Sequence, residues 1–272
     1  MSASIKRLGQ HFLKDISVLR AIAEAVEPRP GETVIEIGPG HGELTKELAL
    51  RCEFLGVSKR RCRIVAIEKD VLLAQQLREK FADNPEIKFV EGDALRLLPE
   101  ITKSYQLSTK NYAVVGNIPY YITGRFLRIL GELEERPSRI VLTIQKEVAE
   151  RIVAEPPRMN RLAAIVQFWA EPRILRIVPR SAFRPEPDVD SAIIVLSTKQ
   201  TTPKTIGFPA YVETARRLFA QPRKTVLNNL RASAPASDVV RALQAVGVAP
   251  DLRPQDLAVQ TITDIATRLA KT

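Results

Sequence analysis

Short apolar runs alternate with longer amphipathic stretches from residue 33 onward. The runs are rich in β-branched residues, as is typical of strands buried on both faces of a parallel sheet, and they lie at 34–37, 64–67, 87–90, 113–115 and 140–144. The stretches with helical spacing are 43–50, 71–81, 122–133 and 146–153. This alternation predicts an α/β domain, a mostly parallel sheet with helices on both faces.

Two further apolar segments, 174–178 and 192–196, have the pattern of a closing hairpin and would complete a seven-stranded sheet. Beyond residue 198 the strand pattern stops. Four stretches with helical spacing follow, separated by proline and polar residues: 211–219, 225–230, 237–246 and 257–269. We therefore expect a domain at 1–202 and a small all-helical domain at 203–272.

The charge balance points to a polyanionic partner. The 272 residues hold 41 Lys and Arg against 31 Asp and Glu, a formal net charge of +10. A soluble protein that is merely basic is the alternative. The Arg-rich segment 51–63 is expected to be a solvated loop that can touch phosphate.

Other features limit the compartment and the metal chemistry. The apolar run 163–170 is too short to span a bilayer, and residues 1–13 lack a signal-peptide core, so we expect a cytoplasmic protein without a membrane partner. Cys52 and Cys62 are expected to be reduced thiols. His11 and His41 lie too far away in sequence to make an obvious zinc site with them, so no metal is expected.

A strand runs into a glycine-rich turn at residues 34–45. The glycines are spaced G-x-G-x-G from Gly38, and Glu36 lies two residues ahead of that glycine. This pattern favours the amino-acid sulfonium of S-adenosylmethionine over the pyrophosphate that G-x-G-x-x-G would bind. A dinucleotide-binding dehydrogenase and a simple tight turn are the alternatives.

Two acids follow the next two predicted strands. Glu68 is placed to accept hydrogen bonds from the ribose hydroxyls of a nucleoside, and Asp93 to accept one from its adenine amine. Either acid could instead face water. Their common position at the carboxyl edge of the sheet favours the nucleoside.

The segment 117–120 reads Asn-Ile-Pro-Tyr and follows the fourth predicted strand. An adenine amine is a poor nucleophile because its lone pair is delocalised into the ring. The Asn117 side-chain oxygen and the main-chain carbonyl of Ile118 could accept its two N–H groups, and Tyr120 could stack on the base. An ordinary turn with a packed tyrosine is the alternative.

These motifs resemble those of the ribosomal RNA adenine dimethyltransferases, and most closely the small-subunit (KsgA-type) branch of that family. The resemblance covers almost the whole chain and rests on segments 9–13 (GQHFL), 38–42, 68, 92–94 (GDA), 117–120, 145–151 (QKEVAER) and 183–187 (FRPEP). It implies a Rossmann-like methyltransferase fold with an N-terminal arm that closes over the cofactor. The sequence departs from the family at Met159-Asn160, at Asp188 and in the long segment 51–63.

The resemblance assigns residues to three roles. The catalytic set is Asn117, Ile118, Tyr120 and Phe183, with Phe183 on the second face of the target base. The cofactor-binding set is Gln10, His11, Leu13, Gly38, Gly40, Glu68, Lys69, Asp93, Ala94 and Asn117. We expect His11 to form hydrogen bonds rather than act as a general base, because a cationic product amine loses its proton readily to water.

The RNA-binding set lies in the predicted helical domain: Arg216, Arg217, Arg223, Lys224, Asn228 and Asn229. This set favours the small-subunit branch, so the partner is expected to be the small ribosomal subunit and its 16S RNA. The resemblance to that branch implies two adjacent adenines in a hairpin loop near the 3′ end as the target and S-adenosylhomocysteine as the product. A monomer is expected. The alternatives are a large-subunit methyltransferase of the antibiotic-resistance type, an assembly factor with secondary catalysis, and a nicotinamide-dependent oxidoreductase.

Overall fold

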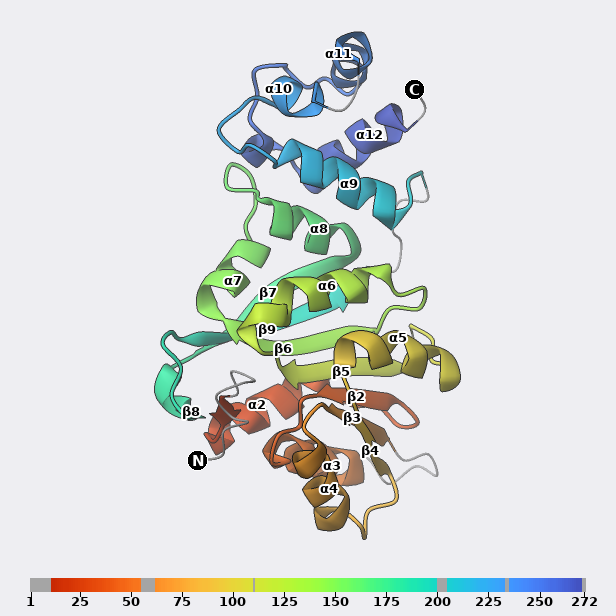
Figure 1. The fold of residues 1–272 in the computed structure, drawn as a ribbon, viewed down its shortest axis with the longest axis vertical. Helices are drawn as coiled ribbons and strands as arrows, with labels where there is room; N and C mark the ends of the chain where they lie inside the picture. The colour runs from red at the N-terminus through yellow and green to blue at the C-terminus, as the bar shows by residue number, and fades with distance from the viewer. Residues whose placement is uncertain (1–10, 55–61, 110, 200–204, 233–234, 271–272) are drawn as a thin grey trace. The chain divides into compact units, whose positions relative to one another are not determined.

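The computed structural model describes residues 11–54, 62–109, 111–199, 205–232 and 235–270. A seven-stranded sheet runs in the order β4-β3-β2-β5-β6-β9-β7 (Figure 1). Its strands are β2 (Thr33–Ile37), β3 (Arg63–Glu68), β4 (Ile87–Glu91), β5 (Tyr112–Asn117), β6 (Arg139–Gln145), β7 (Ala170–Val178) and β9 (Ser191–Thr198). The five strands from β4 to β6 are parallel, and β9 is antiparallel to β6. The predicted fold class is confirmed.

Helices cover both faces of this sheet. Val34, Ile64 and Ala66 lie on one face, which is covered by α2 (Ile16–Val26), α3 (Glu43–Phe54) and α4 (Val71–Lys80). The other face carries α5 (Ala94–Ser104) and α6 (Thr123–Glu132), and α7 (Lys146–Ile152) follows β6 (Figure 1). Because the central strands are buried on both faces, they read in the sequence as continuous apolar runs.

Three of these helices begin at an aspartate. The side chains of Asp15, Asp70 and Asp93 accept hydrogen bonds from the first main-chain N–H groups of α2, α4 and α5, respectively. The caps of α4 and α5 follow directly after β3 and β4. They fix where the chain turns from strand to helix, and so where the polar groups at the carboxyl edge of the sheet lie.

A buried ion pair joins β6 to the segment between α2 and β2. The Arg139 guanidinium on β6 donates to both carboxylate oxygens of Glu32, at 3.0 and 2.7 Å, and to the main-chain carbonyls of Val26 and Glu27. Both side chains are almost fully buried. Each buried charge is therefore compensated by the other, and removing one side chain would leave the opposite charge buried without a partner.

A second small sheet joins the N-terminal segment to a distant part of the chain. Strand β1 (Phe12–Leu13) pairs antiparallel with β8 (Phe183–Arg184). Phe12 lies opposite Arg184, and Leu13 opposite Phe183. The expected N-terminal arm is thus hydrogen-bonded to the segment between β7 and β9, which also holds the short helix η2 (Arg180–Ala182).

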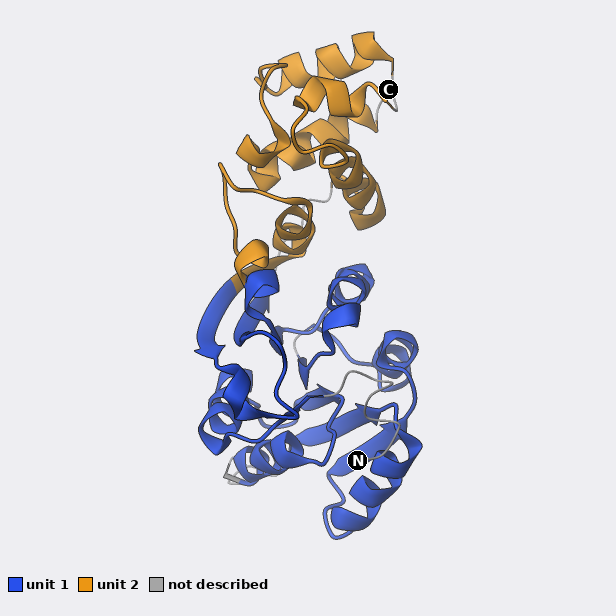
Figure 2. Ribbon diagram, turned by 60° about the vertical axis from the view of Figure 1, so that its left-hand side comes forward, with its two compact units in different colours: residues 1–149, 173–198 blue, residues 150–172, 199–272 orange. Residues whose placement is uncertain are grey.

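The chain divides into two compact units (Figure 2). Unit 1 contains residues 1–149 and 173–198, and unit 2 contains residues 150–172 and 199–272. The described helices of unit 2 are α8 (Arg161–Trp169), α9 (Phe208–Leu218), α10 (Val226–Leu230), α11 (Ala236–Ala245), α12 (Val259–Leu269) and the short η3 (Pro254–Asp256). The junction at 199 lies close to the expected boundary at 203, but residues 150–172 group with the C-terminal helices, which the sequence pattern did not indicate.

The cysteines differ from the sequence prediction. Cys52 and Cys62 form a disulfide, with their Cα atoms 5.3 Å apart, rather than two reduced thiols. The end of α3 and the start of β3 lie side by side, which brings these two residues within bonding reach.

The expected loop at 51–63 is also shorter at both ends. Helix α3 continues to Phe54, and β3 begins at Arg63. Arg51 is paired with Glu24 of α2 rather than projecting freely. Residues 55–61 lie outside the described ranges. Within those ranges, no helix has the length and apolar character needed to cross a membrane.

Candidate active site

A pocket opens at the carboxyl ends of β2, β3, β4 and β5. Parallel α/β sheets bind ligands at this edge. The pocket is lined by His11, Phe12, Ile37, Gly38, Gly40, Ile67, Glu68, Lys69, Gly92, Asp93, Ala94, Asn117, Ile118, Pro119, Tyr120, Tyr121 and Ile122. Most of the residues expected to bind the cofactor are therefore brought together.

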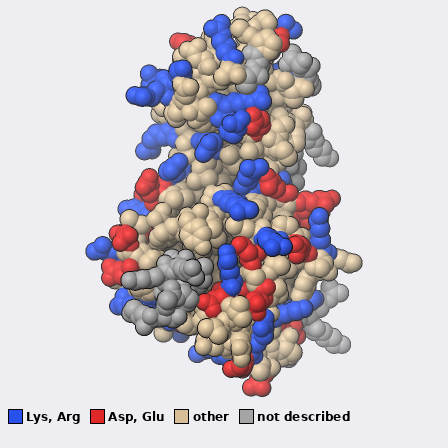
Figure 3. Space-filling model, viewed as in Figure 1, with Lys and Arg blue, Asp and Glu red and all other residues tan. Residues whose placement is uncertain are grey.

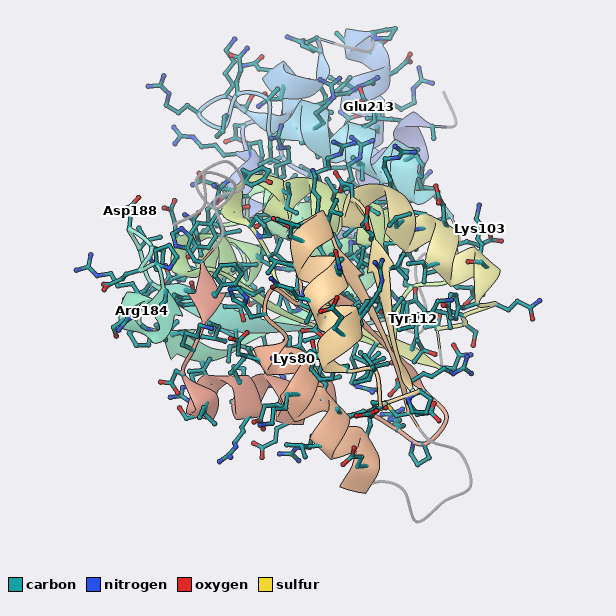
Figure 4. All side chains as sticks on the ribbon, turned by 60° about the horizontal axis from the view of Figure 1, so that its bottom comes forward. Lys80, Lys103, Tyr112, Arg184, Asp188 and Glu213 are labelled. Atoms are coloured by element: carbon teal, nitrogen blue, oxygen red, sulfur yellow. A yellow bond between two sulfur atoms is a disulfide. The ribbon has the colours of Figure 1, made fainter. Side chains whose placement is uncertain are left out.

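The glycine turn forms the floor of this pocket. Gly38 and Gly40 both have positive φ, +65° and +60°, a conformation that strongly favours glycine. A Cβ atom on Gly40 would lie 2.8 Å from the Phe12 ring, so the arm approaches the turn as closely as a bare backbone allows. Lys80, labelled in Figure 4, supports the turn by donating from Nζ to the main-chain carbonyl of His41.

Glu68 is held by main-chain donors at the pocket wall. Its Oε2 accepts from the N–H of Gly40 at 3.1 Å, and its Oε1 accepts from the N–H of Asp70 at 2.9 Å. Burial raises the pKa of Glu68, and these main-chain donors lower it in part. Carboxylate oxygens have further lone pairs, so Glu68 can still accept hydrogen bonds from a ribose.

Asp93 is fixed on two sides just after the end of β4. Its Oδ2 accepts from Lys69 Nζ at 3.0 Å, and its Oδ1 accepts from the N–H of Leu95. Burial works to raise the pKa of Asp93, but these hydrogen bonds and the charge of Lys69 outweigh it and hold the pKa below its usual value. Asp93 is thus an ionised acceptor, with Lys69 as its neighbour in the pocket.

Glu36 does not reach the pocket. It is buried on β2 beneath the glycine turn, where Oε2 accepts from the Thr45 hydroxyl at 2.7 Å. Burial raises the pKa of Glu36 to about 8, and the hydrogen bond from Thr45 only partly opposes this. The carboxyl therefore joins β2 to α3 beneath the turn, outside the lining of the pocket.

Asn117 lies at the end of β5 and is tied to the arm. Its Nδ2 donates to the main-chain carbonyl of His11 at 2.7 Å. Because the amide nitrogen is used in this way, the other end of the amide, Oδ1, remains the acceptor that Asn117 can offer to a ligand. His11 is held in turn by a 2.8 Å hydrogen bond between its Nδ1 and the Pro185 carbonyl.

Ile118 and Tyr120 continue this wall. The N–H of Ile118 donates to the main-chain carbonyl of Thr143 on β6, which fixes the segment after β5 to the sheet. Tyr120 begins the short helix η1 (Tyr120–Ile122), and its half-buried ring stacks near His11 at a centroid distance of 6.1 Å. The edge of the sheet thus combines an amide oxygen, a main-chain turn and an aromatic face.

Two predicted site residues are placed elsewhere. Leu13 is buried in the core and does not line the pocket, and its neighbour Phe12 takes that position. Phe183, pairing with Leu13 in the small sheet, is 1% exposed and packs in the same core. Phe183 is thus not exposed to a ligand in this structure, and its stacking on the target base stays a prediction. Gln10 lies outside the described residues.

Several pocket residues were not predicted as site residues. Besides Phe12, they are Ile37, Ile67, Gly92, Pro119, Tyr121 and Ile122. All but Ile122 adjoin a predicted residue in sequence. Two sequence signals could have identified Ile37 and Ile67 as pocket residues: the alternation of side chains along a strand and the nearby motif glycines. No such signal marks Tyr121, which is exposed.

The predicted RNA-binding residues fall into two groups. Arg216 and Arg217 on α9 both donate to Glu213, labelled in Figure 4, and these hydrogen bonds lower the pKa of Glu213 to about 2. Arg223 and Lys224 lie exposed in the turn before α10, as does Asn228 in that helix. In the first group one carboxylate offsets one of the two positive charges, whereas the second group presents its cations to solvent.

Asn229 differs from the other predicted RNA-binding residues because it is buried, at 4% exposed, and its contact with RNA stays a prediction. Its Oδ1 accepts from the N–H of Gln221, and its Nδ2 lies within 3.2 Å of the main-chain carbonyls of Gln221, Lys224 and Thr225. Asn229 therefore shapes the turn that displays Arg223 and Lys224.

The departures from the family pattern have local explanations. Asn160 caps α8 through Oδ1, which accepts from the N–H groups of Leu162 and Ala163. Met159 is buried, and its N–H donates to the Gln255 carbonyl within unit 2. Asp188 is exposed on the segment that follows β8, on the same side of unit 1 as Arg184 (Figure 4).

The pocket fits S-adenosylmethionine by its glycine cradle and its hydrogen-bond acceptors. The glycine cradle leaves room that a Cβ would fill, and Glu68 and Asp93 supply acceptors where a nucleoside needs them. When bound, this cofactor would supply an electrophilic methyl group on sulfur. Within the described ranges, no cluster of three or more His, Cys, Asp or Glu residues could hold a metal ion.

The sheet order and the pocket beside Asn117 and Tyr120 define an S-adenosylmethionine-dependent methyltransferase. The family model for ribosomal RNA adenine dimethylase matches residues 1–271. The chain therefore belongs to the ribosomal RNA adenine dimethylase family, and it is an enzyme that dimethylates adenine in ribosomal RNA.

Curated relatives carry the name ribosomal RNA small subunit methyltransferase A. The one from Dehalococcoides mccartyi (strain CBDB1) is 36% identical over 258 residues, covering 94% of this chain and 84% of the relative. The one from Deinococcus radiodurans is 37% identical over 267 residues, covering 97% and 85%.

Two solved structures resemble the whole chain. The 23S rRNA methyltransferase ErmE has a TM-score of 0.69 at 28% identity, covering 95% of this chain and 99% of that one. A dimethyladenosine transferase from Plasmodium falciparum has a TM-score of 0.78 at 23% identity, covering 96% and 98%, and it supports the fold alone.

Proposed function

We propose that this enzyme transfers methyl groups from S-adenosylmethionine to the N6 amines of two adjacent adenines in a hairpin loop near the 3′ end of 16S ribosomal RNA. The products are N6,N6-dimethyladenosine and S-adenosylhomocysteine, and no metal takes part. The observation that carries the proposal is the position of Asn117, with its amide nitrogen held by the arm, at the wall of the pocket that Glu68 and Asp93 also line.

Asn117 acts by accepting a hydrogen bond from the target amine. Attack on the methyl group requires the amine nitrogen to become pyramidal and gain positive charge. Oδ1 of Asn117 and the main-chain carbonyl of Ile118 accept its two N–H groups as that charge develops. Since Nδ2 donates to the His11 carbonyl, the amide is already oriented with Oδ1 available before the base arrives. No proton needs to leave the amine before the transfer.

Tyr120 holds the target base by stacking. An aromatic side chain after β5 offers a flat face to an adenine that has left its own stack. Bases in a hairpin loop are already exposed, so the energy needed to extract them is small. Phe183 is buried, so the aromatic contact that supports this role is that of Tyr120.

The helical unit contributes RNA binding. Its residues include 14 Lys and Arg against 8 Asp and Glu, a net +6 of the total +10. Lys and Arg predominate on the face of this unit that Figure 3 shows. The exposed turn with Arg223 and Lys224 is its most direct candidate contact for phosphate. We further propose that the enzyme acts as a monomer in the cytoplasm on the small ribosomal subunit.

Two other functions share the same catalytic half. The similarity to ErmE keeps large-subunit RNA as the second candidate substrate. An assembly factor that binds small subunits with secondary catalysis is the other candidate, and the fixed geometry of Asn117, Glu68 and Asp93 favours catalysis instead.

The test is methyl transfer to unmethylated small and large ribosomal subunits in parallel, with radiolabelled S-adenosylmethionine. We expect label in the small subunit alone. Label in the large subunit alone would assign the enzyme to the resistance type. Tight binding to small subunits without label would favour the assembly factor.

A further inference from the structure

A buried hydroxyl lies behind the tyrosine of the active site. Ser191 is the first residue of β9, and its side chain is 0% exposed. Its Oγ is 3.0 Å from the phenol oxygen of Tyr120, although 71 positions separate the two residues in sequence. This hydroxyl pair links the segment that follows β5 to a strand on the far side of β6.

The two partners differ in how firmly the backbone holds them. Ser191 is fixed in the sheet, where it lies opposite Gln145 of β6. The residue before it, Asp190, accepts at its main-chain carbonyl from the N–H of Lys146 and at Oδ1 from the N–H of Arg180. Tyr120 instead begins a three-residue 3-10 helix, and its ring is half-buried at the pocket. The bond therefore runs from a rigid strand to a less constrained aromatic ring.

We propose that Ser191 is a positioning residue for methyl transfer, one that fixes the ring of Tyr120 so that the ring meets the target adenine in a stacking orientation. A tyrosine ring has two side-chain dihedrals, and the second is broad for an unrestrained ring. An anchor at the hydroxyl, at the far end of the ring from the backbone, restricts both dihedrals. The methyl acceptor then approaches Asn117 with less freedom to tilt, and productive orientation contributes strongly to rate.

The phenol is suited to this bond at neutral pH. Burial raises the pKa of Tyr120, the bond with Ser191 lowers it in part, and the charges of Asp188 and Asp190 raise it further. The phenol therefore stays protonated and can donate to Oγ of Ser191. Because it is neutral, the phenol adds no negative charge next to the base.

This inference rests on the proposed function because its test measures methyl transfer. The variants are Ser191→Ala, Tyr120→Phe and the double variant, each assayed in single turnover on whichever ribosomal subunit the wild-type enzyme methylates. A wrong choice of subunit and a wrong role for Ser191 thus give different results. Thr102→Val is the matched control, because it removes another buried hydroxyl, one that donates to the Pro99 carbonyl in α5 away from the pocket.

We expect Ser191→Ala to lower the transfer rate about tenfold, as expected for the loss of one hydrogen bond in the reacting complex. Cofactor Kd should change by less than about twofold, and the melting temperature should fall no more than in Thr102→Val. Tyr120→Phe should match Ser191→Ala, and the double variant should be no slower than either, because the two changes remove the same bond.

Three results would overturn the role. One is a Ser191→Ala transfer rate equal to that of Thr102→Val. Another is a double variant slowed by the product of the single effects, which would mean that the two hydroxyls act independently. The third is a rate loss that disappears once cofactor is saturating, which would place the effect in cofactor binding.

Discussion

Gly40 is the position where the glycine turn and the N-terminal arm meet, so Gly40→Ala tests whether their contact builds the cofactor pocket. Gly40 has a φ of +60°, and an added Cβ would lie 2.8 and 2.9 Å from two atoms of the Phe12 ring. Its N–H also donates to Glu68. The substitution therefore acts on the backbone, on the arm and on the carboxylate together.

The backbone and steric contributions can be estimated separately. An alanine in the left-handed region costs about 1–2 kcal/mol of folding free energy. Overpacking against a ring costs about 1–3 kcal/mol if the ring stays, but Phe12 belongs to a two-residue strand and can move away instead. We therefore expect a stability loss of roughly 1–2 kcal/mol and a cofactor affinity lowered by about tenfold, since Phe12 leaves the pocket wall.

The control is Gly247→Ala in unit 2. Gly247 has a similar φ of +69°, but nothing lies within 4 Å of an added Cβ. It should lose a similar amount of stability, with cofactor affinity unchanged. Urea unfolding and titration calorimetry with S-adenosylmethionine measure the two quantities. Wild-type affinity in Gly40→Ala would refute the idea that the arm packs on the turn to form the site.

Three further predictions concern stability and RNA binding. Burial raises the pKa of Glu36 from an ordinary value of 4.5 to about 8, so the unfolded chain loses this proton at a lower pH than the folded protein and stability falls as pH rises through that interval. Glu36→Gln should therefore melt higher than wild type at pH 8.5 and equally at pH 4.5. Glu32→Gln should lower the unfolding free energy by about 3 kcal/mol in urea, because the buried charge of Arg139 is then uncompensated; an equal midpoint would contradict this. Replacing both Arg223 and Lys224 with Gln should weaken small-subunit binding and reduce the log–log salt slope by roughly one per cation, and an unchanged slope would exclude that turn from the interface.

Much of the sheet was predictable because buried parallel strands leave continuous apolar runs in the sequence. All five predicted parallel strands and the two strands of the closing hairpin are present within a residue or a few of the expected bounds. Helices α2, α5 and α8 were not predicted. Helix α5 contains Pro99, which disguises a helical pattern, and α8 is apolar on most sides, so its period is weak.

The candidate site was predictable to the extent that its residues follow strands. Glu68, Asp93 and Asn117 each come at the end of a strand, and parallel strands deliver such residues to one edge. Residues whose place depends on side-chain direction were not predictable. In the two-residue strand β1, alternation turns Phe12 to the pocket and Leu13 to the core. Sequence spacing alone cannot say which of the two faces a ligand.

The disulfide and the link between Ser191 and Tyr120 depend on contacts between distant or separately folded elements. Cys52 and Cys62 become neighbours only when α3 packs beside β3. Ser191 reaches Tyr120 only through the placement of β9 next to β6. Nothing in the local pattern of either segment specifies such a pairing.

Asn117→Ala tests the central claim most directly, through the single-turnover rate of methyl transfer and the Kd for S-adenosylmethionine measured on the same preparation. The account predicts a Kd close to that of wild type and a rate lower by roughly 30- to 1000-fold, the equivalent of about 2–4 kcal/mol of lost transition-state stabilisation. An unchanged rate, or a loss explained entirely by weaker cofactor binding, would contradict the assignment of Asn117 as the acceptor for the target amine.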